Sequence, residues 1–195
     1  MSNYIQDGTG RGFLARVDNE NRLLTRASVQ SEFDKSTSLG SAFNINTEFI
    51  TITNATETPL LYIKNEDDFD LIVEAWFVGT DVAIGTATRQ SIMRVHANPT
   101  GGTIISAGAD LDVVNRSIGS SDELNAVVKS GGDAFTLTTL GTPVLYQTQA
   151  NVARNFGIVH LSLKKGSSLA VTIQTYGLTS IDVYTGFQVY KSENI

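Results

Sequence analysis

The chain has 195 residues, of which 41% are hydrophobic and only 17% charged, and its formal net charge is -6 with a pI near 4.8. This hydrophobic content can fill the core of one ordinary domain. The net charge is negative and no stretch concentrates Lys or Arg, so nucleic acid is a poor partner. The lack of cysteine excludes disulfides, thiolate nucleophiles and Cys-ligated zinc.

The N-terminal residues 1–10 are polar, with Asp7 as their one charged side chain. They therefore lack the basic start and the apolar stretch of a signal peptide. No run approaches the roughly 20 apolar residues that a membrane helix needs. We expect a soluble protein that is made in the cytoplasm and has no membrane partner.

Residues 1–40 form the first distinct segment, in which charges of both signs and several glycines interrupt any sustained apolar pattern. Phe13, Ala15 and Val17 fall at alternate positions, and Leu23 and Leu24 follow a turn-rich stretch, so this part can form a hairpin. An isolated hairpin is marginal in water, and fixing each backbone residue costs about 1–2 kcal/mol. We therefore predict an extended N-terminal arm that is ordered only against a partner.

The glycines of this arm, Gly8, Gly10 and Gly12, superficially resemble a phosphate-binding loop. The pattern is not placed between a strand and a helix, and Gly-Lys-Ser/Thr occurs nowhere in the chain, so a flexible tether is the better interpretation.

From about residue 48 onward, apolar residues recur with period two and β-branched residues dominate, which is typical of half-buried strands. The segment 71–78 is apolar almost throughout and predicts a central strand buried on both faces. Turn residues separate the segments, as expected for an antiparallel sandwich or barrel. The predicted strands are 50–53, 60–63, 71–78, 91–96, 103–107, 134–140, 144–149, 158–163, 168–175 and 181–190.

One segment of this region predicts a short helix in a crossover between strands. Ser120 and Glu123 have the spacing of a capping box, and Leu124, Val127 and Val128 follow at helical intervals. We therefore expect an all-β protein, with residues 41–195 as a β-sandwich domain and one helix after residue 120.

Two acidic clusters could offer oxygen ligands to calcium. They are the turn 66–70 and the pair Asp110 and Asp112. Calcium takes six to eight oxygens, and neither cluster has the spacing of an EF-hand loop, so solvated turns are the favoured interpretation. We predict no metal site and no cofactor.

His96 and His160 are the only histidines, so any Ser-His-Asp arrangement must use one of them. No G-x-S-x-G elbow is present to make a serine nucleophilic, and we predict no catalytic residue. Trp76 could stack on a sugar ring, but its apolar surroundings in the sequence favour a place in the core. Carbohydrate binding by loops stays open as an alternative.

Several segments resemble a family of small virion proteins of tailed bacteriophages. Residues 7–23 show a Gly-Thr-Gly start, an alternating strand and a Val-Asp-x-x-Asn-Arg-Leu turn. Further similar segments follow in order along the chain, at 42–47, 59–65, 98–105 and 163–169.

The resemblance implies a jelly-roll capsid decoration protein, or cement protein, on the outside of the virion, made in the host cytoplasm. Its implied partners are the major capsid protein and further copies of itself, as a homo-oligomer and most simply a trimer. It supplies no catalytic residues. The arm residues predicted to contact the capsid or a neighbouring subunit, by strand addition or by lying over a surface, are Arg11, Phe13, Leu14, Arg16, Val17, Arg22, Leu23 and Leu24.

Two other functions stay open from the sequence. One is a head fibre, tail or receptor-binding component that recognises host surface glycan. The other is an enzyme that acts on surface polysaccharide or peptidoglycan, although nothing in the sequence brings two carboxylates together.

Overall fold

The computed structural model contains two units, residues Met1–Ser31 and Glu32–Ile195, which are described separately. The described residues of the chain are 3–6, 14–17, 23–24, 31–80, 90–149, 154–177 and 180–192. Within these ranges, no helix is both long enough and apolar enough to cross a membrane.

The N-terminal unit holds a small antiparallel sheet of three strands. Strand β2 (Leu14–Val17) lies between β1 (Asn3–Gln6) and β3 (Leu23–Leu24). Antiparallel pairing places Asn3 opposite Val17 and Leu24 opposite Arg16. The alternating segment and the leucine pair therefore lie side by side, and β1 adds a strand that the sequence pattern did not indicate.

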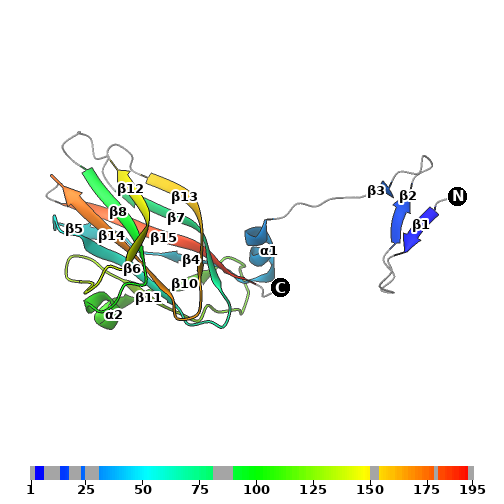
Figure 1. The fold of residues 1–195 in the computed structure, drawn as a ribbon, viewed down its shortest axis with the longest axis horizontal. Helices are drawn as coiled ribbons and strands as arrows, with labels where there is room; N and C mark the ends of the chain where they lie inside the picture. The colour runs from blue at the N-terminus through cyan, green and yellow to red at the C-terminus, as the bar shows by residue number, and fades with distance from the viewer. Residues whose placement is uncertain are drawn as a thin grey trace. The chain divides into compact units, whose positions relative to one another are not determined.

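The larger unit is a sandwich of two antiparallel sheets (Figure 1). The order of the first sheet is β10-β4-β15-β7-β13, and β5 also pairs with β15. Its strands are β4 (Ala42–Asn46), β5 (Ile50–Ile52), β7 (Leu71–Thr80), β10 (Val113–Asn115), β13 (Arg154–Leu163) and β15 (Ile181–Lys191).

The order of the second sheet is β12-β8-β14-β6-β11-β9. Its strands are β6 (Thr58–Asn65), β8 (Gln90–Ala97), β9 (Ala109–Asp110), β11 (Ala126–Ser130), β12 (Thr142–Gln149) and β14 (Ser168–Tyr176).

The connectivity of eight long strands is that of a jelly-roll. In chain order these strands are β4, β6, β7, β8, β12, β13, β14 and β15, and they divide into the neighbours β4-β15-β7-β13 and β6-β14-β8-β12. All of them pair antiparallel, and the chain changes sheet at every step except from β8 to β12. The all-β, antiparallel sandwich predicted from the sequence is confirmed.

The core lies between the two sheets and follows the alternation of the strands. In β14, Leu169, Val171 and Ile173 all face the core, as the period-two pattern predicts. Trp76 is also in the core, with only 5% of its surface exposed, and its Nε1 donates a hydrogen bond of 2.9 Å to Thr185 Oγ1. The core position predicted for the tryptophan is therefore confirmed.

The segment 98–141, between β8 and β12, covers part of the outer face of the second sheet. It includes helix α2 (Thr103–Ala107) and buries Ile104 against Tyr62 and Ala170 of that face. Phe135 and Leu137 pack against the same small cluster. The insertion also adds β10 to one sheet and β9 and β11 to the other, so it extends both layers.

The helix predicted after residue 120 is wrong, because residues 126–130 form strand β11. Leu124, Ala126 and Val128 contact the main core, whereas Val127 contacts the small outer cluster. Apolar residues on both faces of one strand imitate a helical pattern. The Ser120 hydroxyl accepts a hydrogen bond from the Asp122 N–H at 3.2 Å and so closes a turn instead of capping a helix.

Two predicted strands are also wrong. Residues 103–107 form α2 and residues 134–140 form a loop with one isolated bridge, between Thr100 and Thr139. Both segments pack against one small cluster on a sheet face, where Ile104 is buried and Phe135 and Leu137 are partly buried.

Helix α1 (Glu32–Leu39) falls within the range predicted as arm and packs against β4 and β15. Phe33 anchors it through an edge-on contact with Tyr190, at 6.1 Å between ring centroids, and through the guanidinium of Arg116, 4.7 Å from the Phe33 ring. The chain therefore joins the sandwich through a helix that the sequence pattern did not reveal.

Candidate functional site

The predicted arm residues lie in the N-terminal unit. Leu14, Arg16 and Val17 belong to β2, and Leu23 and Leu24 form β3. Arg11, Phe13 and Arg22 lie outside the described residues.

The order of this small sheet limits how it can bind a partner. All of β2 is paired with β1, and Arg16 and Val17 are also paired with β3. Within β2, only Leu14 and Ala15 have a pairing partner on one side alone among the described strands. β1 and β3 each have one neighbour among the described strands of the unit, so addition of a partner strand would use the outer edge of one of these two strands.

A second candidate contact is the end of the sandwich at which α1 lies. We call it the α1-end surface, and its hollow has a volume of about 270 Å³. The side chains of Leu39 and Phe69 are 57% and 43% exposed there. The residues that line the hollow are Leu39, Ser41, Phe69, Asp122, Lys191 and Ser192.

Lys191 holds the base of the α1-end surface rigid. Its ammonium lies 2.9 Å from a carboxylate oxygen of Asp122 and 3.3 Å from one of Asp67. Burial would raise the pKa of Asp67, but the hydrogen bond and the positive charge of Lys191 outweigh it, so this pKa is lowered. The exposed side chains of Leu39 and Phe69 therefore lie beside a lysine that two carboxylates hold in place.

The loop beside this surface presents Ile118 with its side chain fully exposed. Asn115 fixes the loop, because its amide donates to the carbonyl oxygens of Gly40, at 2.6 Å, and of Asp122, at 2.9 Å. A single exposed apolar side chain is common on protein surfaces, so Ile118 alone does not define a contact surface.

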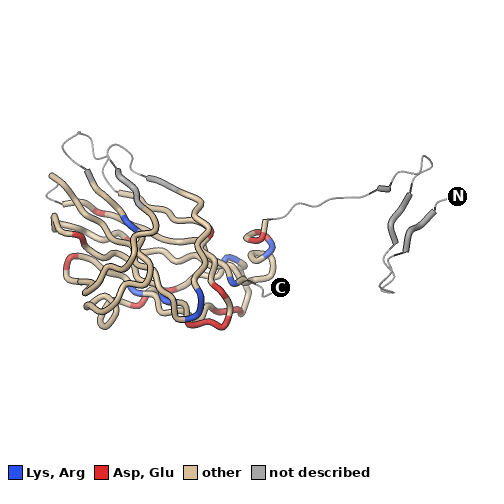
Figure 2. The backbone as a smooth tube through the Cα atoms, in the orientation of Figure 1, with Lys and Arg blue, Asp and Glu red and all other residues tan. Residues whose placement is uncertain are grey.

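The two acidic clusters considered for calcium are placed differently in the structure. In the turn 66–70, Glu66 pairs with Lys64 at 2.9 Å, Asp68 pairs with Lys165 at 2.5 Å and Asp70 pairs with Lys164. Figure 2 shows acidic and basic residues side by side at this end of the sandwich. Lysine ammonium groups therefore balance the charges of Glu66, Asp68 and Asp70.

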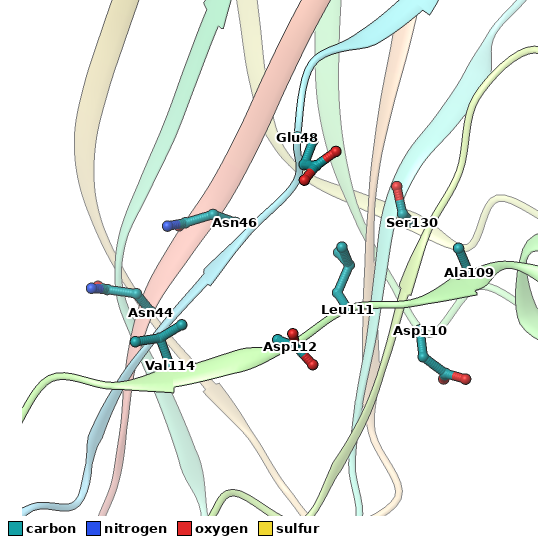
Figure 3. Close-up of a pocket in the computed structure, with 9 residues that line it drawn as sticks. All are labelled: Asn44, Asn46, Glu48, Ala109, Asp110, Leu111, Asp112, Val114 and Ser130. Atoms are coloured by element: carbon teal, nitrogen blue, oxygen red, sulfur yellow. The ribbon is translucent and has the colours of Figure 1, made fainter. Parts of the chain in front are cut away.

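Asp110 and Asp112 line an open polar groove with a volume of about 450 Å³ (Figure 3). Asn44, Asn46 and Glu48 border it from β4 and the residues that follow β4. Asp110 pairs with Lys129 at 2.6 Å. Across the described ranges, no three His, Cys, Asp or Glu side chains are grouped as metal ligands would be, so the groove is polar and acidic without a metal-binding set.

His96 belongs to a buried polar network on the outer side of the second sheet. Its Nε2 lies 2.9 Å from Glu57 Oε1 and 3.1 Å from Thr172 Oγ1. The Thr172 hydroxyl donates to the same Glu57 oxygen at 2.5 Å, and Arg94 Nη1 lies 3.1 Å from Glu57 Oε2. Burial raises the pKa of Glu57, but its hydrogen bonds from Thr172 and His96 and the charge of Arg94 outweigh burial and lower it.

The network contains the residue types of a catalytic triad but not its geometry. In a triad the two ring nitrogens of histidine hold different partners, one the nucleophile and the other the acid. Here both Glu57 and Thr172 contact Nε2, and Nδ1 has no hydrogen-bond partner among the described residues. Thr172 is fully buried, so a substrate could not reach its hydroxyl.

His160 occupies a bulge in strand β13, where the pairing with β7 shifts between Ile158 and Leu161. Its backbone has a φ of 44°, and its Nδ1 lies 2.9 Å from Glu74 Oε2 on the exposed face. Bulges protect edge strands from unwanted pairing. His160 therefore shapes the edge of the sheet and lies on a different sheet from His96.

No protein-family model matches this chain, and none of the curated proteins matches it. Its function is therefore inferred from the fold and from the surfaces described above.

Proposed function

We propose that this protein decorates the outer surface of a bacteriophage capsid and stabilises it, as a homo-oligomer and most simply as a trimer. In this role the sandwich is a rigid block, the N-terminal unit binds the major capsid protein or a neighbouring copy, and no cofactor or catalysis is required. The resemblance of residues 7–23 and of the later segments to phage virion proteins supports the virion location.

The observation that carries the proposal is the separate N-terminal unit. Its described strands, β1, β2 and β3, contain four, four and two residues. A sheet of this size cannot bury enough apolar surface to offset the entropy of ordering its backbone. A partner surface would supply the missing burial.

The α1-end surface gives the proposal a second contact. Helix α1 begins directly after the N-terminal unit, and Leu39 at its other end is exposed beside Phe69. A specific interface of standard size buries about 1,200–2,000 Å² in total. Two contacts in one subunit, repeated in an oligomer, reach strong binding through avidity.

Deleting residues 1–31 is expected to abolish binding to capsids that have been stripped of the protein, because the partner-dependent unit is gone. Co-sedimentation with the particles measures the binding. Circular dichroism and thermal unfolding of the truncated chain serve as the control and should report a folded β-protein, since the core lies entirely within residues 32–195. Saturation of the particles by the truncated chain would refute the role of the unit.

Replacing Leu39 and Phe69 together by serine is expected to weaken particle binding by roughly 10- to 100-fold, the size of effect that loss of two interface anchors produces. Because both side chains are substantially exposed, the free energy of unfolding should change by less than about 1 kcal/mol. Val114→Ser, at another exposed apolar position (55%), is the matched control. Equal binding by the double variant and the wild type would exclude the α1-end surface from the interface.

A further inference from the structure

Three aromatic rings gather on the outer face of the first sheet, and we call them the aromatic surface. The ring of Tyr184, in β15, lies 5.0 Å from that of Phe49 and 6.3 Å from that of Phe77 in β7, between centroids. Phe49 stands edge-on to Tyr184, at an interplanar angle of 75°, and is 60% exposed.

Glycines in the neighbouring strands make room for two of these rings. Tyr184 is opposite Gly79, and Phe77 is opposite Gly186. A Cβ atom at Gly79 would lie 2.2 Å from the Tyr184 ring, and one at Gly186 would lie 2.4 Å from the Phe77 ring. The Tyr184 ring therefore packs against the backbone at Gly79, and the Phe77 ring packs against the backbone at Gly186.

Sheet stability accounts for part of this arrangement. An aromatic side chain that covers a glycine on the next strand protects the backbone there. This explains Tyr184 and Phe77. It does not explain Phe49, which lies between β4 and β5 and exposes most of its ring.

Polar groups surround the rings and connect them to the groove in Figure 3. The Asn46 side chain also lies over Gly186, since a Cβ there would be 2.8 Å from Asn46 Oδ1. Asn46 and Glu48 both line the groove (Figure 3), and Glu48 directly precedes Phe49. Two residues after Phe49, the Thr51 hydroxyl of β5 donates to Asp182 Oδ1 of β15 at 2.5 Å.

We infer that the aromatic surface and the adjoining groove bind an uncharged pyranose ring of a surface polysaccharide. A pyranose has an apolar C–H face, which packs on aromatic rings, and a rim of hydroxyls, which hydrogen-bond to carboxylates and amides. Asn46, Glu48 and Asp182 supply both kinds of polar group beside the rings. This binding goes beyond the proposed capsid role and does not depend on it.

The charges of the site decide between classes of ligand. Glu48 and Asp112 would repel uronic and sialic acids, so the ligand is a neutral sugar. They also disfavour a place at the centre of a subunit interface, where charge is normally depleted.

The test presents the full-length protein to an array of neutral oligosaccharides built from glucose, galactose, mannose and N-acetylglucosamine, with counterparts that end in uronate or sialate. We expect binding to a neutral glycan and none to its acidic counterpart. Titration with the bound oligosaccharide, followed by NMR, should give a Kd on the order of 1 mM for a single site. Phe49→Ala should weaken this binding by up to roughly tenfold, which is the scale of an aromatic contact.

Tyr176→Ala is the matched control, because Tyr176 is an exposed aromatic residue (42%) at the end of β14, in the other sheet, and the variant should bind sugar as the wild type does. Binding to no neutral glycan, or equal binding by Phe49→Ala, overturns the inference. A change in oligomer mass in Phe49→Ala without sugar also overturns it, because the ring would then lie between subunits. Since particle co-sedimentation is measured separately, the results of glycan binding do not bear on the capsid role.

Discussion

Replacing Phe187 by alanine is expected to lower the free energy of unfolding of the sandwich by about 3–5 kcal/mol. Phe187 is fully buried in β15, a strand with neighbours on both sides. Ile45 of β4 and Trp76 of β7 are its register partners. Truncation would leave a cavity where β4, β15 and β7 face the opposite sheet. Because β15 is paired on both sides, the surrounding residues have little freedom to move into the cavity.

Urea unfolding followed by fluorescence measures this loss, because Trp76 is the sole tryptophan and is itself in the core. Phe69→Ala removes the same atoms from an exposed site and should cost less than about 1 kcal/mol. If the two variants lost equal stability, the core would not be organised around β15 as described.

Replacing Glu57 by glutamine is expected to destabilise the sandwich by about 1–3 kcal/mol at neutral pH. The carboxylate accepts hydrogen bonds from Thr172 and His96 and faces Arg94, and only 20% of its side chain is exposed. Glutamine keeps the size and one acceptor oxygen but removes the charge that Arg94 and the two donors stabilise.

The pH dependence tests the charge directly. Because the pKa of Glu57 in the folded protein lies below its usual value of 4.5, the ionised carboxylate stabilises the fold. Its contribution is complete above 4.5 and is lost as the pH falls through the lower, folded-state pKa. The difference between the wild type and Glu57→Gln in urea unfolding should therefore shrink at acidic pH.

Glu66→Gln is the control for the pH series, since Glu66 is part of an exposed pair with Lys64 and surface pairs contribute little. Its effect should stay below about 1 kcal/mol throughout. A difference between Glu57→Gln and the wild type that did not vary with pH would show that packing, and not charge, is what Glu57 contributes.

The candidate sites were only partly predictable. Acidic residues, histidines and the tryptophan are visible in the sequence, but their roles depend on neighbours. Glu57, His96 and Thr172 are separated by 39 and 76 positions, and no local pattern marks them as partners. The aromatic surface was missed for the same reason, because Phe49, Phe77 and Tyr184 come from three segments. Glycines opposite aromatic residues become a signal only once the strand register is known.

The sequence by itself determined the class of fold and most of the strands, because the alternation of side chains across a strand is a local property that each segment carries alone. The tertiary structure decided which strands pair, which faces are covered and where a helix replaces a strand. Residues 103–107 and 120–130 show why: each has apolar residues whose partners lie on a sheet face far away in sequence, and burial against that face overrides the local preference. The polar network and the aromatic surface likewise exist only because the jelly-roll brings distant strands into register.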